Sequence, residues 1–328
     1  MYLVFDVGAT FIKYAWMTED GDIIEKSKTP TPVDLEGKTF QEAIDEFVET
    51  IGGIYDVYKN QGNVDGIAMG LPGQIDVKRG IVYNGGGIRY LDKVCLQDLI
   101  SKRCQDVLVA LENDGKCAAL AEVWKGNAKD VKDACVLVFG TGIGGGIVRN
   151  RKVIHGKHLL AGETSFILTD ITREDLDKLP PGEDLMESMD VPDIVKTLPY
   201  TWTTTCSAVN MCQRIADELG LPREDVTGEK VYQWAREGQQ KVIDMLEDTY
   251  FTIAKTCLSL FVILDPQIIL IGGGISAEPQ FVEGIVRYVN QLKRLSNVYR
   301  NIKIDTCKFL NDSNLLGALY NFKQKYKF

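Results

Sequence analysis

Two patterns of apolar and polar residues alternate along the chain, and together they predict a protein that mixes strands with helices. Residues 2–29 contain three short apolar runs, separated by a polar glycine loop and an Asp-Gly turn, which predicts three antiparallel strands. Residues 134–156 repeat this order of strand, glycine loop, strand, polar turn and strand. The repetition predicts two related halves rather than an array of short repeats.

Helical periodicity and buried-strand patterns occupy most of the remaining chain. Apolar residues recur at spacings of three and four in residues 39–60, which predicts a helix with one buried face. Further helices are predicted from about Leu96, over 115–126, over 229–264 and from Asn314, and further strands over 64–73, 107–114 and 266–276. Residues 169–200 carry four prolines and broken periodicity, so an irregular insertion is expected there.

Length and charge narrow the class of protein. A chain of 328 residues is longer than one hydrophobic core usually supports, so two domains with a cleft between them are expected. The net charge of -9 leaves no excess of positive charge for a nucleic-acid backbone or an anionic bilayer, which favours small-molecule partners. No apolar run approaches the roughly 20 residues of a transmembrane helix, and Asp6 interrupts the first apolar stretch, so a cytoplasmic location is expected.

The eight cysteines are scattered along the chain and form no C-x-x-C pair. Cys206 and Cys212 are the closest two, and their separation fits none of the usual zinc spacings. We interpret the cysteines as reduced thiols and expect no zinc site.

The first glycine loop, DVGATFIK, has the residue types that phosphate binding requires. Asp6 offers a carboxylate that could hold Mg²⁺ through water, and small residues let backbone N–H groups approach a phosphate. The predicted phosphate contacts are Gly8, Ala9 and Thr10, with Lys13 as a further candidate. An ordinary glycine turn and an exposed strand lysine are the alternatives.

The second loop, FGTGIGGGIV, contains G-x-G-x-x-G at Gly140, Gly142 and Gly145, a spacing also found in dinucleotide-binding proteins. That fingerprint requires a helix directly after the glycines. The residues that follow here, IVRNRKVI, have instead the β-branched residues and polar turn of another strand, so NAD binding is rejected. The chain also lacks the G-x-x-x-x-G-K-[ST] sequence of a P-loop. Two facing hairpins would instead hold the phosphates of ATP. The contacts predicted in this second loop are Gly140, Thr141, Gly142 and Gly144.

A triple glycine follows the last predicted buried strand. Gly272, Gly273 and Gly274 would place flat backbone near the adenosine of ATP. A tight turn without a ligand is the alternative for these three residues.

Six motifs occur in a characteristic order: DVGAT, GLPGQID, LENDGKCAALAE, FGTGIGGGIV, AGE and DPQIILIGGGIS. In this order they resemble the ROK family of bacterial sugar kinases and repressors, over nearly the whole chain. The resemblance implies an α/β protein of the actin-like ATPase (hexokinase/RNase H-like) fold. Such a protein has two related domains that close over sugar and ATP, and each domain contains a mixed five-stranded sheet. It also implies that the last helix returns to the first domain, which predicts one domain of 1–115 with 312–328 and another of 116–311.

The resemblance also assigns roles to particular residues. It makes Asp114 the catalytic base, which takes the proton of a sugar hydroxyl during phosphoryl transfer from Mg-ATP. Helix N-capping is the alternative for Asp114, because a run of helix formers follows it. Asn113, Gly73 and Glu163 are implied sugar contacts, with a plain surface charge as the alternative for Glu163. Asn84 is a further sugar candidate, although the glycines after it are also typical of a turn.

The chain departs from the family's usual pattern after the AGE motif. Most members continue with a Gly-His pair and a zinc-binding cysteine motif, whereas here Phe166 stands in the place of the histidine and no cysteine cluster follows. Residues 201–211 replace the segment that carries the family's last cysteine and second sugar-binding glutamate. We interpret His155 and His158 as ordinary surface or packing residues. A zinc-free variant is therefore expected.

The altered sugar contacts leave the identity of the sugar open. The stretch GIVYNGGGIRYLDKV looks somewhat like that of the β-glucoside kinases in the family, which favours a hexose or a β-glucoside, phosphorylated at its 6-hydroxyl. The resemblance further implies a homodimer or homotetramer.

Two other functions are considered. A ROK-type transcriptional regulator would carry an N-terminal helix-turn-helix, but here a strand is predicted from about residue 2 and the net charge is negative. A sugar-binding protein without catalysis is the second alternative. The presence of Asp6, Asp114 and both glycine loops argues against it.

Overall fold

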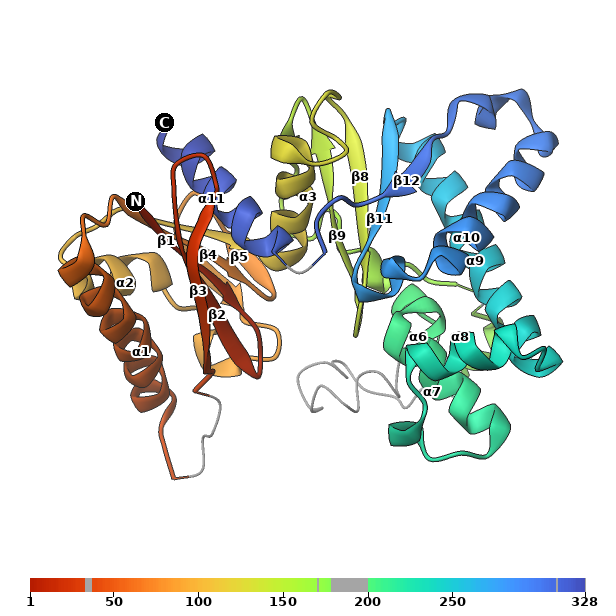
Figure 1. The fold of residues 1–328 in the computed structure, drawn as a ribbon, viewed down its shortest axis with the longest axis horizontal. Coiled ribbons are helices and arrows are strands. Elements are labelled where there is room, and N and C mark those ends of the chain that lie inside the picture. The colour runs from red at the N-terminus through yellow and green to blue at the C-terminus, as the bar shows by residue number, and fades with distance from the viewer. Residues whose placement is uncertain (33–36, 170, 178–199, 311, 328) are drawn as a thin grey trace. The chain divides into compact units, whose positions relative to one another are not determined.

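The computed structural model describes residues 1–32, 37–169, 171–177, 200–310 and 312–327 (Figure 1). The strands are β1 (Tyr2–Val7), β2 (Phe11–Met17), β3 (Ile23–Pro30), β4 (Gly66–Leu71), β5 (Gln74–Asp76), β6 (Ile81–Asn84), β7 (Val109–Asn113), β8 (Ala134–Phe139), β9 (Ile143–Arg149), β10 (Lys152–Val153), β11 (Ile268–Gly272) and β12 (Ile304–Thr306). The helices are α1 (Phe40–Gln61), α2 (Leu96–Arg103), α3 (Asp114–Lys125), α4 (Arg173–Leu176), α6 (Trp202–Cys206), α7 (Ala208–Leu219), α8 (Gly228–Arg236), α9 (Gln240–Leu264), α10 (Pro279–Leu292) and α11 (Ser313–Tyr326).

The strands form two sheets of five and one short two-stranded sheet. The first five-stranded sheet has the order β3-β2-β1-β4-β7, in which β1 and β2 are antiparallel and β1, β4 and β7 are parallel. The second has the order β10-β9-β8-β11-β12, in which β8, β11 and β12 are parallel. The two orders correspond strand for strand. The prediction of two related halves with mixed five-stranded sheets is therefore confirmed.

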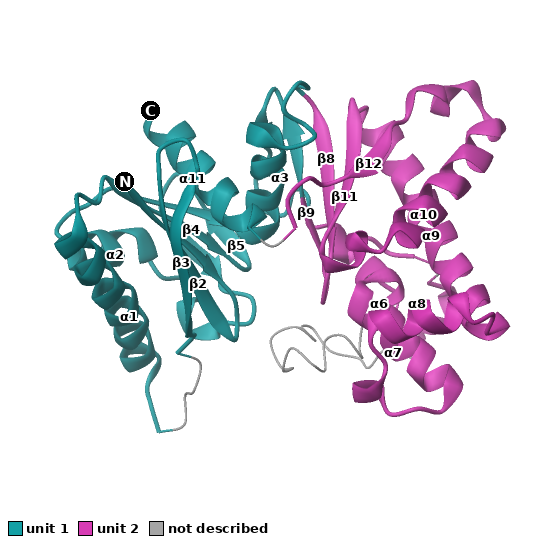
Figure 2. Cartoon of the chain, viewed as in Figure 1, with its two compact units in different colours: residues 1–132, 146–162, 311–328 teal, residues 133–145, 163–310 magenta. Residues whose placement is uncertain are grey.

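The chain divides into two compact units (Figure 2). Unit 1 comprises residues 1–132, 146–162 and 311–328, and unit 2 comprises 133–145 and 163–310. The C-terminal helix α11 is thus part of the unit that contains the N-terminus. The domain division expected from the sequence, 1–115 with 312–328 and 116–311, stays a prediction.

Helices cover both faces of the first sheet. Successive side chains of a strand point to opposite faces, and β1 shows this directly. Leu3 and Phe5 pack in one core cluster with Phe47 of α1, whereas the ring of Tyr2 lies 5.3 Å from that of Phe322 on α11. In unit 2 the long helix α9 and helix α10 pack with β8 and β11 in a second core cluster.

Some elements differ from the sequence expectation. The helix predicted over 229–264 is two helices, α8 and α9, because Gly238 takes a positive φ of 83° and ends the first one. Helices α7 and α10 were not predicted, although Pro279 at the start of α10 is a usual helix signal. Most of the expected irregular insertion, residues 178–199, lies outside the described residues, and α4 lies within its first part. No helix in the described part of the chain is long and apolar enough to cross a membrane.

Candidate functional site

Asp6 lies at the end of β1, next to the first glycine loop. Its side chain is largely buried, and its Oδ2 lies 3.3 Å from Nζ of Lys13 on the neighbouring strand β2. Asn314 of α11 donates from Nδ2 to Oδ1 of Asp6 at 2.9 Å. The loop after β1 is tight, because Gly8 N–H donates to the carbonyl of Phe11 at 3.0 Å. The structure therefore brings Asp6 and Lys13 together and adds Asn314, which sequence reasoning missed.

The loop beyond Asp6 is also held by Thr31, the residue that directly follows β3. Thr31 Oγ1 donates to the carbonyl oxygen of Gly8 at 2.7 Å. Ala9 and Thr10, the two residues at its tip, are exposed. Their backbone is thus presented at the surface of unit 1 by a loop anchored on both sides.

The candidate base and three candidate sugar contacts lie close together in unit 1. Asn113 ends β7 and Asp114 begins α3. Asn113 Nδ2 donates to the carbonyl of Gly73 at 3.0 Å. Gly73 in turn lies close to the carbonyl of Asn84, because a Cβ on Gly73 would be 2.0 Å from that carbonyl oxygen. Gly73 also has a φ of +87°, which favours glycine. The side chain of Asn84 is exposed, and its Oδ1 accepts from Gly86 N–H at 2.8 Å.

The N-cap of α3 is Asn113 and not Asp114. Oδ1 of Asn113 accepts from the backbone N–H of Lys116 at 3.0 Å, which is the usual capping contact. The capping alternative for Asp114 is therefore wrong, because α3 begins at Asp114 itself and the residue before it occupies the cap position. Asp114 is the first helical residue, and its Oδ1 accepts from Gly115 N–H at 2.8 Å.

Glu112, two residues before the candidate base, is paired with the partly buried His155. The side chain of Glu112 is fully buried, and both its carboxylate oxygens lie close to Nε2 of His155, at 2.9 and 3.1 Å. Oε1 of Glu112 also accepts from Asn113 N–H at 2.8 Å. The interpretation of His155 as an ordinary residue missed this contact, since the partners are 43 positions apart. His158 is exposed, as expected of a surface residue.

Three carboxylates act electrostatically on one buried thiol of α3. Burial, and then the charges of Glu112, Asp114 and Asp6, raise the pKa of Cys117 well above its ordinary value. The strand register explains why Asp6 and Glu112 act on the same thiol. Asp6 on β1 is opposite Gly70 on β4, and Gly70 is opposite Glu112 on β7. The carboxyl ends of these parallel strands thus concentrate negative charge at one edge of the sheet.

The second glycine loop and the triple glycine lie side by side in unit 2. Strands β8 and β11 are parallel, with Val138 opposite Gly272, so the loops that follow them emerge at the same edge. Gly273 has a φ of 93°, and a Cβ on it would lie 2.1 Å from the carbonyl oxygen of Phe139. Only glycine allows this close approach. Thr141 at the tip of the loop is exposed.

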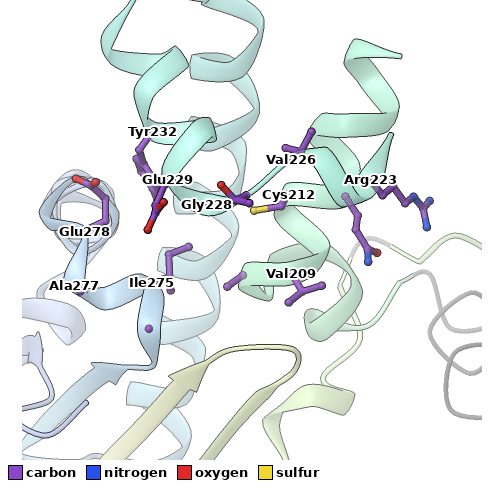
Figure 3. A pocket seen from close by; sticks show the side chains of 14 residues that line it. Val209, Cys212, Arg223, Val226, Gly228, Glu229, Tyr232, Ile275, Ala277 and Glu278 are labelled. Carbon is purple, nitrogen blue, oxygen red and sulfur yellow. The ribbon is translucent and has the colours of Figure 1, made fainter. Parts of the chain in front are cut away.

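A cavity of about 660 Å³ lies beside Gly274, between α7, the start of α8 and the turn after β11 (Figure 3). Its wall includes the apolar side chains of Val209 and Ile275 and the carboxylate of Glu229. Its volume is in the range typical of small-molecule sites. Val209 N–H donates to the carbonyl of Gly140 at 3.3 Å, so the wall of the cavity contacts the second glycine loop.

Glu163 follows Gly162, which takes a positive φ of 86°, and it precedes a short 3-10 helix over Thr164–Phe166. The side chain of Phe166, in the place of the family's histidine, is 52% exposed. Ser165, between them, accepts from the backbone N–H of Ile143 at 3.2 Å. The segment of Glu163 is therefore joined to the second glycine loop.

In the ranges that the structure describes, no group of three His, Cys, Asp or Glu side chains could hold a metal ion. A single carboxylate is nevertheless enough for Mg²⁺ that arrives with nucleotide phosphates, and Asp6 fits that role.

A family model described as ROK matches residues 2–325. The chain belongs to the ROK family. Two curated relatives are similar over most of its length. A β-glucoside kinase from Klebsiella pneumoniae is 29% identical over 98% of this chain and 96% of the relative. A β-glucoside kinase from Listeria monocytogenes is 29% identical over 98% of this chain and 97% of the relative. Among solved structures, a ROK family protein from Streptococcus pneumoniae in complex with sucrose is 27% identical, covers 99% of both chains and has a TM-score of 0.78.

Membership of the ROK family confirms the resemblance inferred from the six motifs. The two mixed five-stranded sheets are those of the actin-like ATPase architecture expected for this family. In this ROK protein, Asp6 lies near the end of β1, Asn113 ends β7 and Gly272 ends β11, and each of these strands has a parallel neighbour.

Proposed function

We propose that this ROK protein transfers the γ-phosphoryl group of ATP to a hydroxyl of a sugar, with Asp114 as general base. The observation that carries the proposal is the place of Asp114 at the start of α3, next to Asn113 and Gly73. Ligands of α/β proteins commonly bind at the carboxyl ends of parallel strands, and Asp114 follows such an end.

In this proposal Asp114 accepts the proton of the sugar hydroxyl as the hydroxyl oxygen bonds to the γ-phosphorus. The bond from that phosphorus to the oxygen of the β-phosphate breaks, and ADP leaves with that oxygen. Asn113, Gly73, Asn84 and Glu163 would hold the other hydroxyls of the sugar. The buried Glu112 holds the backbone N–H of Asn113 and so supports the strand end before the base.

The residues proposed to contact the nucleotide are Asp6, Lys13 and the first glycine loop in unit 1, and the second glycine loop and the triple glycine in unit 2. Mg²⁺ bound with ATP neutralises charge on the phosphate oxygens. Asp6 would hold this ion through water, with Lys13 beside it. Backbone N–H groups of residues 8–10 and 140–144 would donate to the phosphates, and the cavity beside Gly274 would take the nucleoside.

The substrate class proposed is a hexose or a β-glucoside, phosphorylated at its 6-hydroxyl. The support is the similarity, over nearly the whole chain, to two proteins named β-glucoside kinases. The reaction would take place in the cytoplasm, where ATP is available.

An ADP-release screen with Mg-ATP tests the proposal over hexoses, amino sugars and β-glucosides. We expect turnover of at least one sugar by the parent protein. In Asp114→Asn the turnover rate should fall by about 10²- to 10⁴-fold, because a general base contributes an effect of that size. Asp130→Asn is the matched control, since Asp130 lies exposed in a turn after α3.

The outcomes separate the proposal from its alternative. Activity in the parent and in Asp130→Asn but not in Asp114→Asn supports the kinase. If none of the three proteins turns over any sugar while sugars still bind, the protein is a sugar-binding module without catalysis.

A further inference from the structure

Three hydroxyl groups surround the backbone of one residue of the second glycine loop. They belong to Thr164, Ser165 and Thr203, and the residue is Ile143. We infer that Ser165 and Thr203 are positioning residues, which hold residues 140–144 in the conformation that binds nucleotide phosphates. The inference rests on the proposed function, because it assumes that this loop contacts ATP.

The backbone of Ile143 is held on both its N–H and its carbonyl side. The N–H donates to Ser165 Oγ at 3.2 Å and to Thr203 Oγ1 at 3.1 Å. The carbonyl oxygen accepts from Thr164 Oγ1 at 3.0 Å and from Ser165 Oγ at 3.1 Å. The two outer hydroxyls are also linked, since Thr203 Oγ1 donates to Ser165 Oγ at 2.7 Å. Four hydrogen bonds thus hold a single residue at the beginning of β9, and a fifth links two of the hydroxyls that make them.

The backbone of Ile143 is shielded from water, whereas Ser165 and Thr203 themselves are partly buried. Ile143 is fully buried and Thr164 is 5% exposed. A Cβ on Gly142 would lie 3.3 Å from Ser165 Oγ, so the loop lies directly against this hydroxyl. A buried backbone donor that loses its acceptor costs considerable free energy, which makes the hydroxyls important for the loop.

The hydroxyls come from two segments that lie side by side. Trp202 N–H donates to the carbonyl of Ile167 at 2.7 Å, and Thr169 N–H donates to the carbonyl of Tyr200 at 2.7 Å. These bonds join residues 163–169, which contain Glu163, to the start of α6. These are the same two segments in which the sequence departs from the usual pattern of the family. Here hydroxyl groups join them to each other and to the glycine loop.

A positioning role predicts a specific pattern of mutant effects. Ser165→Ala and Thr203→Val each leave one acceptor for the Ile143 N–H, so each should weaken binding of Mg-ADP by about two- to threefold. The double variant removes both acceptors, and its dissociation constant should rise by about tenfold or more, beyond the product of the single effects. Sugar binding should change less than nucleotide binding.

Two variants serve as controls. Thr203→Ser keeps a hydroxyl at the same position and should bind Mg-ADP like the parent. Thr205→Val lies on the same short helix, but the Thr205 hydroxyl contacts the carbonyls of Thr201 and Trp202 and the hydroxyl of Thr169 instead. It should also bind Mg-ADP like the parent.

Amide hydrogen exchange at Ile143 provides a readout that does not depend on activity. The exchange rate should increase in Thr203→Val, increase further in the double variant and remain unchanged in Thr205→Val. If the double variant does not fold, the comparison of Thr203→Val with Thr203→Ser still decides between a lost hydroxyl and a general packing defect.

The inference is overturned if a folded double variant binds Mg-ADP as tightly as the parent, or if Thr205→Val weakens binding equally. A parent that binds Mg-ADP but phosphorylates no sugar contradicts the proposed function alone. A parent that does not bind Mg-ADP contradicts both.

Discussion

At the scale of single residues, the buried carboxylate of Glu112 explains how the candidate base is held. A fully buried carboxylate requires hydrogen-bond partners, and Glu112 has His155 Nε2 on one side and Asn113 N–H on the other. The carbonyl of His155 in turn accepts from Ala161 N–H at 3.1 Å, which closes the loop before Glu163. One histidine therefore supports the residues before the base and the segment that leads to a candidate sugar contact.

His155→Ala should lower the free energy of unfolding by about 1–3 kcal/mol, because it removes a partner of a buried carboxylate. It should also lower the turnover rate more than it raises KM for ATP. His158→Ala is the matched control, since His158 is exposed, and its free energy of unfolding should stay within about 0.5 kcal/mol of the parent value. Urea unfolding and steady-state kinetics measure both effects. Equal losses in the two variants would contradict the role given to His155.

At the scale of elements, the packing of α11 against α3 connects the two ends of the chain. A Cβ on Gly317 of α11 would lie 1.7 Å from the carbonyl oxygen of Cys117 on α3, so the two helix backbones are in direct contact. Helix α11 also carries Asn314, which donates to Asp6, and Asn321, which donates to the carbonyl of Leu111 at 3.0 Å. A glycine on α11 thus permits the arrangement that places both α3 and Asn314.

Gly317→Ala should destabilise the protein by about 1–3 kcal/mol, because the added methyl group has no space and the helices must separate. The matched control is Gly53→Ala, at an exposed position of α1 with open space around the added Cβ. This control should be neutral or stabilise by up to about 1 kcal/mol, since alanine favours the helix more than glycine does. Thermal and urea unfolding of the two variants provide the comparison. A neutral Gly317→Ala would show that the helices do not pack this closely.

At the scale of the whole molecule, the eight cysteines divide by accessibility. Cys95 is exposed and the other seven are buried. Burial raises the pKa of Cys135 to about 12, and it also raises the pKa of Cys104 to about 12. A thiolate is the reactive form of cysteine, so these buried thiols are both inaccessible and protonated at neutral pH.

The native protein should therefore show one thiol that reacts rapidly with an aromatic disulfide reagent at about pH 8, and eight thiols after unfolding in guanidinium. Cys95→Ser should abolish the rapid phase and leave the free energy of unfolding nearly unchanged, because Cys95 is exposed. Two or more rapid thiols in the native parent would contradict the described burial.

Local sequence patterns determined the elements and the motif positions. The two strand-loop-strand patterns, the apolar face of α1 and the glycine loops depend on neighbouring residues, which act through turn geometry and helical or strand periodicity. For this reason Asp6 and the two glycine loops could be selected from local patterns, whereas the role of Asp114 was implied by the resemblance to the ROK family. The break at Gly238 and helix α10 also have local signals, a glycine and a proline, which helical periodicity by itself does not include.

Tertiary structure alone decided which side chains meet. Asn314 reaches Asp6 across 308 positions, and Ser165 reaches Thr203 across 38. Such contacts depend on strand order and helix packing, which local patterns do not encode. Even the identity of the N-cap of α3 as Asn113 depended on where β7 ends in its sheet. The sequence by itself thus indicated the chemistry of the site, whereas the folded chain determined the partners that hold it in place.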